Sequence, residues 1–271
     1  MITVSEFFRL ARSRTQRSFA VAWMLAEREV VAEFRTSRLS IAWPLIYPLS
    51  YTALFAFVRP ALNGAYETPL MSFVVFVFVG FGLWQTWFEA MRSQMDAVRK
   101  NKSLMTRAEL GSATLFLLTF IVTGLHMLPR VLLSIVLALF IFPIGPVEVL
   151  VFIVASFFLL LNGSVIGAIL QPFSTLSPDL GKAIQSVSLA LLVTGAVFLP
   201  VSSTSSFALK LAVALNPLGA LLNAARAPLM AEPLLNVTAS VAWCIATTVL
   251  AALVFALGRR VLPILMERIG N

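Results

Sequence analysis

The chain alternates between long apolar runs and short polar stretches. The apolar runs hold about 20 residues each, the length that an α-helix needs to cross a bilayer. We expect six transmembrane helices, at residues 39–58, 70–90, 110–142, 147–171, 183–200 and 237–257. Pro44, Pro48 and Pro129 predict bends in the first and third of them. The pattern therefore predicts an all-α integral membrane protein with little room for a soluble domain.

Residues 19–37 are too short and too charged to span a bilayer, but their pattern is helical. The apolar positions recur every three or four residues and so share one face: Phe19, Trp23, Ala26, Val30 and Phe34. Charged side chains fill the opposite face. This predicts an N-terminal amphipathic helix in the headgroup layer. A soluble-type helix packed on something else is the alternative.

Residues 201–236 are partly apolar, yet Pro217, Pro228 and Pro233 divide them into pieces too short to cross. We expect one or two re-entrant or interfacial helices between the fifth and sixth spans, on the outer side. Non-helical backbone at membrane depth is tolerated only where protein or water covers it.

The basic residues predict the orientation. With the N-terminus inside, cytoplasmic segments hold 16 of the 20 Lys and Arg and outer segments hold 3, while Arg130 lies within the third span. This bias places both termini in the cytoplasm. The expected division is a cytoplasmic N-terminus with the interfacial helix (1–38), a six-span domain (39–257) and a cytoplasmic tail (258–271).

Composition excludes several protein classes. The chain is 59% hydrophobic and 12% charged, and its mean hydropathy is +0.94. A soluble domain is about 45–50% apolar and about 25% charged, so a soluble enzyme, a disordered chain and a coiled coil are excluded. The net charge of +8 follows from the cytoplasmic loops and does not predict a nucleic-acid partner. One cysteine and one histidine leave no intrachain disulfide and no Cys/His metal cluster.

The sequence lacks the motifs of an energy-coupling or catalytic site. It has no Gly-rich phosphate-binding loop ending in Gly-Lys-Ser/Thr, since Gly181-Lys182 is followed by Ala183. The expected spans hold few ionisable residues, whereas a proton-coupled carrier needs relays inside the membrane. We therefore expect the energy for any transport to come from another subunit.

Several short motifs follow one another over nearly the whole chain. In order they are Glu29 and Arg35 with Ser37-Arg38-Leu39-Ser40, Trp43 and Pro48; Gly80, Trp84, Trp87 and Phe88; Ser177 to Lys182; and Asn216-Pro217-Leu218 with Arg226. Together they resemble the membrane subunits of type-2 ABC exporters, in particular the polysaccharide-export branch that handles capsule, O-antigen or teichoic acid. Ser40 stands where that branch has glycine.

The resemblance implies a homodimer in the bacterial inner membrane. Each copy would bind one of two cytoplasmic ABC ATPase chains, which would carry ATP and Mg²⁺. This chain would then be a transport subunit without cofactor or enzymatic activity. A lipid-linked polysaccharide would pass through the dimer interface, with membrane lipids and periplasmic export components as further partners.

Two cytoplasmic links, 91–109 and 172–182, would dock on the ATPase according to the resemblance, with the N-terminal helix nearby. The expected contact residues are Glu29, Arg35, Arg38, Arg99, Lys100, Lys102, Arg107 and Asp179. The alternative is that both links are ordinary basic loops on the cytoplasmic side.

An aromatic stripe predicts a path for the glycan. Its members recur every four residues along the first span: Trp43, Tyr47, Tyr51 and Phe55. Sugar rings stack their C–H faces on aromatic rings, and Tyr hydroxyls bond to sugar hydroxyls. Polar residues of the fifth span would form a second wall: Gln185, Ser188 and Thr194. The alternative for the stripe is an interfacial belt. The aromatic residues of the second span are interpreted as lipid-facing or as part of an interfacial belt, with a place on the glycan path as the alternative: Phe73, Phe76, Phe81, Trp84, Trp87 and Phe88.

Arg130 and His126 lie one turn apart in the third span. An intramembrane arginine is a functional candidate, so Arg130 is predicted to contact a lipid phosphate or an acidic sugar. Alternatively, it extends its side chain toward the interface. Gly163 and Gly167 are interpreted as a close helix-packing site.

Two other functions stay open. The first is a type-2 ABC exporter of small hydrophobic compounds. The second is an integral-membrane enzyme acting on lipid-linked sugars, which needs acidic residues gathered at the membrane surface. Glu67, Glu148 and Glu232 are instead scattered singly along the sequence.

Overall fold

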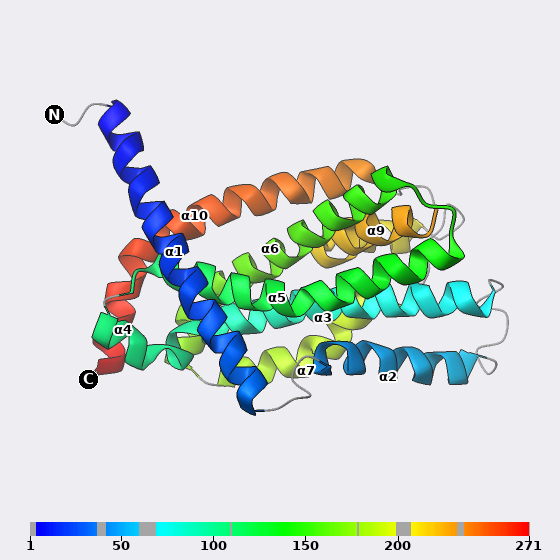
Figure 1. The fold of residues 1–271 in the computed structure, drawn as a ribbon, viewed down its shortest axis with the longest axis horizontal. Coiled ribbons are helices and arrows are strands. Elements are labelled where there is room, and N and C mark those ends of the chain that lie inside the picture. Colours follow the sequence, from blue (N-terminus) through cyan, green and yellow to red (C-terminus); the bar gives the residue numbers. More distant parts are fainter. Residues whose placement is uncertain are drawn as a thin grey trace.

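The computed structural model describes residues 4–36, 42–59, 69–108, 110–177, 179–198, 207–231 and 236–270, and all its regular elements in these ranges are helices. The helices are α1 (Val4–Thr36), α2 (Trp43–Val58), α3 (Leu70–Lys100), α4 (Lys102–Ala108), α5 (Ser112–Ile141), α6 (Pro146–Leu176), α7 (Asp179–Thr194), α8 (Phe207–Leu215), α9 (Pro217–Leu229) and α10 (Val237–Gly270). Figure 1 shows α3, α5, α6 and α10 running lengthwise together, with α1 crossing them obliquely.

Four helices, α3, α5, α6 and α10, are long and apolar enough to cross a membrane. The chain is therefore a multi-pass helical membrane protein. Six spans were expected, whereas four helices among the described residues have the length and hydropathy of a span. Helices α2 and α7 occupy the first and fifth expected spans, but each has 16 residues, about 24 Å of helix.

The centre of the molecule is the contact between α3 and α6. A Cβ atom added to Gly163 would overlap the carbonyl oxygen of Trp87, and one added to Gly167 would overlap that of Met91. The two glycines thus bring the helix backbones together, which confirms their interpretation as a packing site. Asn162 joins a third helix to this contact: its amide oxygen accepts from Trp87 Nε1 and its amide nitrogen donates to Thr247 Oγ1 of α10, both at 2.9 Å.

Helix α1 begins 15 residues before the predicted start and packs on α5. Ala22 and Ala26 are fully buried against Leu118 and Val122. The predicted apolar face is divided, because three of its aromatic residues stay 39–50% exposed: Phe19, Trp23 and Phe34. The alternative of a helix packed on the chain is therefore correct for the alanine side, while the aromatic side remains open to the surroundings.

The segment before α10 forms two short helices that meet at Asn216-Pro217. The Asn216 side chain accepts from the amide of Leu218 and caps α9. Residues 218–229 are all buried. Arg226 is 3% exposed, donates to the carbonyl oxygens of Ala196 and Val197, and lies 3.8 Å from the centre of the Phe76 ring. This arginine therefore has a structural role in the part of the chain that the structure describes.

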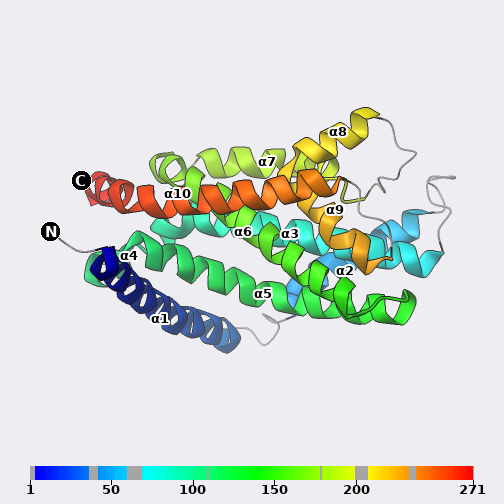
Figure 2. The ribbon, with the colours of Figure 1, turned by 90° about the horizontal axis from the view of Figure 1, so that it is seen from above.

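Helix α10 continues from the sixth expected span through the expected tail to Gly270, and the cytoplasmic location of this tail stays a prediction. Figures 1 and 2 both show the beginning of α1, helix α4 and the end of α10 at one end of the molecule. The last turns of α3 lie close by, since Lys100 and α4 are separated by Asn101 alone.

Candidate functional site

A cavity of about 610 Å³ lies between α1, α2, α3 and α5. Five aromatic residues contribute to its walls: Tyr47, Tyr51, Phe81, Trp84 and Phe88. Six charged residues and one histidine also line it: Glu29, Glu33, Glu89, Arg92, Asp96, Lys100 and His126. A smaller hollow of about 180 Å³ beside it is lined by Trp43, Pro44 and Arg130 among others.

The aromatic walls consist of stacked rings. Tyr51 stacks on Phe81 with ring centres 4.2 Å apart, and Trp84 stacks on Phe88 at 5.4 Å with an angle of 7° between the planes. Tyr47 and Tyr51 are 51% and 42% exposed. Three members of the predicted stripe therefore line the two hollows. The fourth, Phe55, stacks on Phe198 at 3.9 Å instead and is half-buried in the protein.

The interpretation of the second-span aromatics as lipid-facing is wrong. Phe73, Phe76, Phe81 and Trp87 are at most 5% exposed, and Trp84 and Phe88 line the cavity. The reason is that α3 occupies the centre of the bundle, where other helices cover it on several sides. An aromatic belt at the membrane surface and an aromatic central helix have the same composition, so the sequence did not separate them.

Arg130 joins three helices beneath the cavity. Its Nη2 donates to both carboxylate oxygens of Glu89 at 2.9 Å, its Nη1 donates to Thr86 Oγ1 at 3.0 Å, and its Nε donates to the carbonyl oxygen of Pro44 at 2.9 Å. The Arg130 side chain is 3% exposed, whereas that of Glu89 is 36% exposed. Both bonds to Glu89 come from one nitrogen, so this is a charge-assisted ion pair and not the two-nitrogen fork of a bidentate arginine–carboxylate pair.

This geometry limits what Arg130 can bind. Its Cβ lies opposite Gly82, and its guanidinium lies one turn or more further along α3, at Thr86 and Glu89. The side chain thus extends along α3 from Gly82 to Thr86 and Glu89, and its extension to the membrane interface stays a prediction. An anionic ligand would have to displace Glu89. The contact with a lipid phosphate or an acidic sugar stays a prediction.

Two buried polar atoms at the cavity wall lack a hydrogen-bond partner within the described residues: Gln85 Oε1 and Trp84 Nε1. Gln85 Nε2 donates to Glu89 Oε1 at 2.9 Å, so only the oxygen of this amide is unpaired. An unpaired buried donor and an unpaired buried acceptor each carry a desolvation penalty.

The rim of the cavity connects α1 to α5. His126 Nε2 lies 3.0 Å from Glu33 Oε2. Partial burial, and secondly the charge of Glu33, raises the pKa of the Glu29 carboxyl, against the opposing influence of Lys100 and His126. Sequence analysis missed this contact, because Glu33 and His126 are 93 residues apart and nothing in either segment indicates the other.

The residues expected to contact an ATPase are distributed over four helices, α1, α3, α4 and α7, within the described part of the chain. Arg35 is exposed in the last turn of α1, Arg99 is exposed and pairs with Asp96, and Asp179 pairs with Lys182 at 3.2 Å with both side chains at least 80% exposed. Lys102 begins α4 and Arg107 belongs to it, Lys100 and Glu29 line the cavity, and Arg38 lies outside the described residues.

The expected second wall does not line the cavity. Gln185, Ser188 and Thr194 lie on α7, which contributes no residue to it. The Ser188 and Thr194 hydroxyls donate to the carbonyl oxygens of Gln185 and Ala190 within the same helix. A role for these residues in a glycan path stays a prediction.

The cavity gathers four carboxylates, those of Glu29, Glu33, Glu89 and Asp96, beside His126, which is the feature that the enzyme alternative requires. No group of three or more His, Cys, Asp or Glu side chains suited to a metal ion occurs among the residues that were placed. Ring faces next to carboxylates and an amide are suited to a ligand with several hydroxyls. No protein-family model matches this chain, and no curated protein matches it.

Proposed function

We propose that this chain is the membrane-spanning subunit of an ATP-driven exporter. It moves a lipid-linked polysaccharide across the bacterial inner membrane through a path formed by two copies of itself. A separate cytoplasmic ABC ATPase, in two copies, supplies the energy. The motifs described above carry the resemblance to polysaccharide exporters, and the multi-pass helical architecture agrees with it.

The observation that carries the proposal is the aromatic and charged cavity between α1, α2, α3 and α5. In a carrier of small hydrophobic compounds, seven ionisable side chains around the ligand would be unfavourable, because each of these side chains needs water or a polar partner. A polysaccharide supplies such partners, since its hydroxyls pair with carboxylates and amides while its ring faces stack on Tyr47 and Tyr51.

The proposal requires α2 to cross the membrane alongside α3. Contacts at both ends of α2 support this. At its start, the carbonyl oxygen of Pro44 accepts from Arg130, which also binds Glu89. At its end, Arg59 lies 5.1 Å from the centre of the Phe73 ring. Helix α2 thus accompanies the apolar part of α3, from Glu89 to Phe73.

The proposal also requires a mechanical connection between the two cytoplasmic links. Gly181, in the first turn of α7, lies next to Met95 near the end of α3, where a Cβ on the glycine would be 3.9 Å from Met95 Cε. The two cytoplasmic links, residues 91–109 and 172–182, are therefore neighbours at this point. A push by an ATPase on either link would reach α3, which lines the cavity.

Co-purification with an ATPase tests the proposal. The chain is expressed with the ABC ATPase encoded beside it, extracted in mild detergent, and analysed for subunit masses and ATPase rate. We expect a two-plus-two complex that hydrolyses ATP. Reversing charge at Arg99, Lys100 and Asp179 should reduce ATPase recruitment at least tenfold.

The matched control is Arg17→Glu, which changes the charge of an exposed residue of α1 outside the expected contact set and should leave recruitment intact. A chain that recruits no ATPase contradicts the proposal. In that case the enzyme alternative has to be examined by offering lipid-linked sugars to the purified protein.

A further inference from the structure

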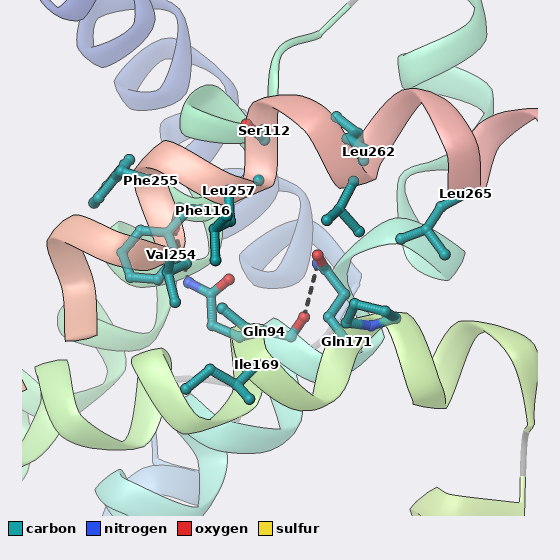
Figure 3. A pocket seen from close by; sticks show the side chains of 14 residues that line it. Gln94, Ser112, Phe116, Ile169, Gln171, Val254, Phe255, Leu257, Leu262 and Leu265 are labelled. Carbon is teal, nitrogen blue, oxygen red and sulfur yellow. Dashed lines mark hydrogen bonds between the residues drawn. The ribbon is translucent and has the colours of Figure 1, made fainter.

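A second cavity, of about 230 Å³, lies between α3, α5, α6 and α10 (Figure 3). It shares no lining residue with the aromatic cavity. Its lining contains no ionisable side chain and only three polar residues: Gln94, Ser112 and Gln171. The rest of the wall is apolar, with Phe116, Phe255, Leu262 and Leu265 among its larger members.

The two glutamines present acceptors to this cavity. Gln94 Nε2 donates to the carbonyl oxygen of Phe116 at 2.8 Å, and Gln171 Nε2 donates to the main-chain oxygen of Gln94 at 3.1 Å. Both amide nitrogens are thus engaged, while neither Oε1 accepts a hydrogen bond from the described residues. The Ser112 hydroxyl is enclosed without a partner. Gln94 is 1% exposed and Gln171 is partly exposed, and Figure 3 shows both side chains at the cavity.

This set of groups selects the chemistry of a ligand. Carboxamide oxygens pair only with donors, so a ligand must bring a hydroxyl or an N–H group. An anion would face two acceptors, and any ion would enter an apolar wall without a counter-charge, which is costly. The polar part of the ligand must therefore be an uncharged donor and its remainder must be apolar.

The mouth of the cavity indicates the route of entry. Ile169 on α6 is 43% exposed and Leu257 on α10 is 55% exposed, and both belong to the lining. These apolar side chains lie on two of the helices that are suited to cross the membrane. A ligand therefore enters between α6 and α10, close to the end of the candidate span on α10, where Gly258, Leu262 and Leu265 belong to the lining.

We propose that this cavity binds one uncharged amphiphile dissolved in the membrane, an aliphatic alcohol or a neutral lipid with a free hydroxyl. The hydroxyl donates to the carboxamide oxygen of Gln171, the more exposed of the two glutamines. The hydrocarbon part packs among Phe116, Phe255 and Leu262. Because α10 supplies half of the wall, the bound ligand also holds the cytoplasmic part of α10 against α3 and α6. The proposal is independent of the exporter function.

Photolabelling of the full-length protein tests this. A diazirine-bearing octanol is irradiated with the protein in detergent, and labelled peptides are mapped by mass spectrometry. We expect labels on α6 and α10 around Ile169 and Leu262, which 1-octanol displaces. Octane should displace them at least fivefold less well, since it lacks the donor, and octanoate should not displace them.

A mouth-blocking variant and its control complete the test. Ile169→Trp should reduce the labelling at least fivefold. Ile153→Trp is the matched control, because Ile153 lies on the same helix, is 45% exposed and is outside the lining; its labelling should equal that of the wild type. Equal labelling of the two variants, or equal displacement by octane, octanol and octanoate, would overturn the proposal.

The variant Gln171→Met tests whether the cavity recognises the hydroxyl of the ligand or only its hydrocarbon part. Methionine keeps the length of the side chain and removes the acceptor, so displacement by 1-octanol should weaken about threefold, as expected for one hydrogen bond, while displacement by octane should not change. If displacement by octanol is unchanged in this variant, the ligand hydroxyl does not bond to Gln171, and the proposed selectivity for a hydroxyl is wrong.

Discussion

Arg130 and Glu89 form an ion pair in which the two partners differ in environment. The arginine is buried, and the carboxylate is about one-third exposed at the cavity. A buried guanidinium without a carboxylate carries a large desolvation penalty. The pair therefore matters for stability mainly through Arg130, while its partner remains within reach of a ligand.

Replacing Glu89 by Gln should destabilise the protein by about 1–3 kcal/mol, because Arg130 stays buried and loses its counter-charge. The exposure of Glu89 keeps the value below that of a fully enclosed pair. The loss is measured as a lower unfolding temperature in detergent. Adding Arg130→Met to Glu89→Gln should restore part of it.

The comparison for this pair is Asp179→Asn, which breaks the exposed Asp179–Lys182 pair. Its effect should stay within about 0.5 kcal/mol. If Glu89→Gln is as harmless as Asp179→Asn, the buried pair contributes no net stability.

The raised pKa of Glu29 makes the attachment of α1 depend on pH. A carboxyl whose pKa is raised in the folded protein binds its proton more tightly there than in the unfolded chain. Its contribution is present in full below the ordinary value of 4.5 and is lost as pH rises through the raised pKa. Hydrogen exchange of α1, corrected for intrinsic rates, should therefore show more protection at pH 5 than at pH 7.5.

Glu29→Gln should make α1 better protected at pH 7.5 and reduce the pH dependence. Glu27→Gln, two residues away on α1 and outside the cavity lining, should retain the pH dependence of the wild type. Loss of the dependence in both variants would show that another group causes it.

At the scale of elements, the α3–α6 contact sets the tolerance of the core. Ala at Gly163 or Gly167 has to push a carbonyl-bearing backbone of α3 away, and strain of this kind costs about 1–3 kcal/mol or more. Both variants should lower the unfolding temperature and the yield of folded protein. Gly124→Ala is the control, since its Cβ would meet Leu160 Cδ2 at an ordinary 3.6 Å; a similar loss there would contradict the argument.

The positions of the long helices could be predicted from the sequence, but their ends could not. The second expected span ends at residue 90, whereas α3 continues to Lys100. The length of an apolar run in the sequence reflects the thickness of the bilayer. The helix itself continues beyond that run as long as the following residues favour a helix. The same difference explains why α1 and α10 exceed their expected bounds.

The aromatic stripe on α2 could be predicted because it repeats within one helix. The opposite wall could not be predicted, because only the structure shows that Trp84 and Phe88 of α3 line the same cavity as the residues of α2. The expected wall on α7 rested on polarity alone. Its hydroxyls are already paired with their own helix, which polarity in the sequence does not reveal.

At the scale of the whole molecule, the remaining question is whether α2 and α7 cross the membrane. If both cross, single cysteines at Thr36 and Asp179, in a Cys244→Ala background, react with impermeant maleimide from the cytoplasmic side only. Cysteines at Pro69 and Phe207 then react from the outer side only. The proposed exporter architecture expects this pattern.

Labelling of Thr36→Cys and Pro69→Cys from the same side would show that α2 does not cross. A cysteine at Leu253, which is 50% exposed on the apolar part of α10, serves as the control and should react from neither side in intact membranes.

The central position of α3 has a consequence for how the protein is made. Three polar side chains of α3 have hydrogen-bond partners that come later in the chain. Arg130 lies 41 residues after Glu89, the Phe116 carbonyl 22 residues after Gln94, and Asn162 75 residues after Trp87. During translation, α3 therefore reaches the bilayer before any of these partners exists. Its polar groups need the insertion machinery or lipid headgroups until α5 and α6 arrive. Of the four long apolar helices, α3 has the largest buried share in the folded protein, and it is inserted before the helices that bury it.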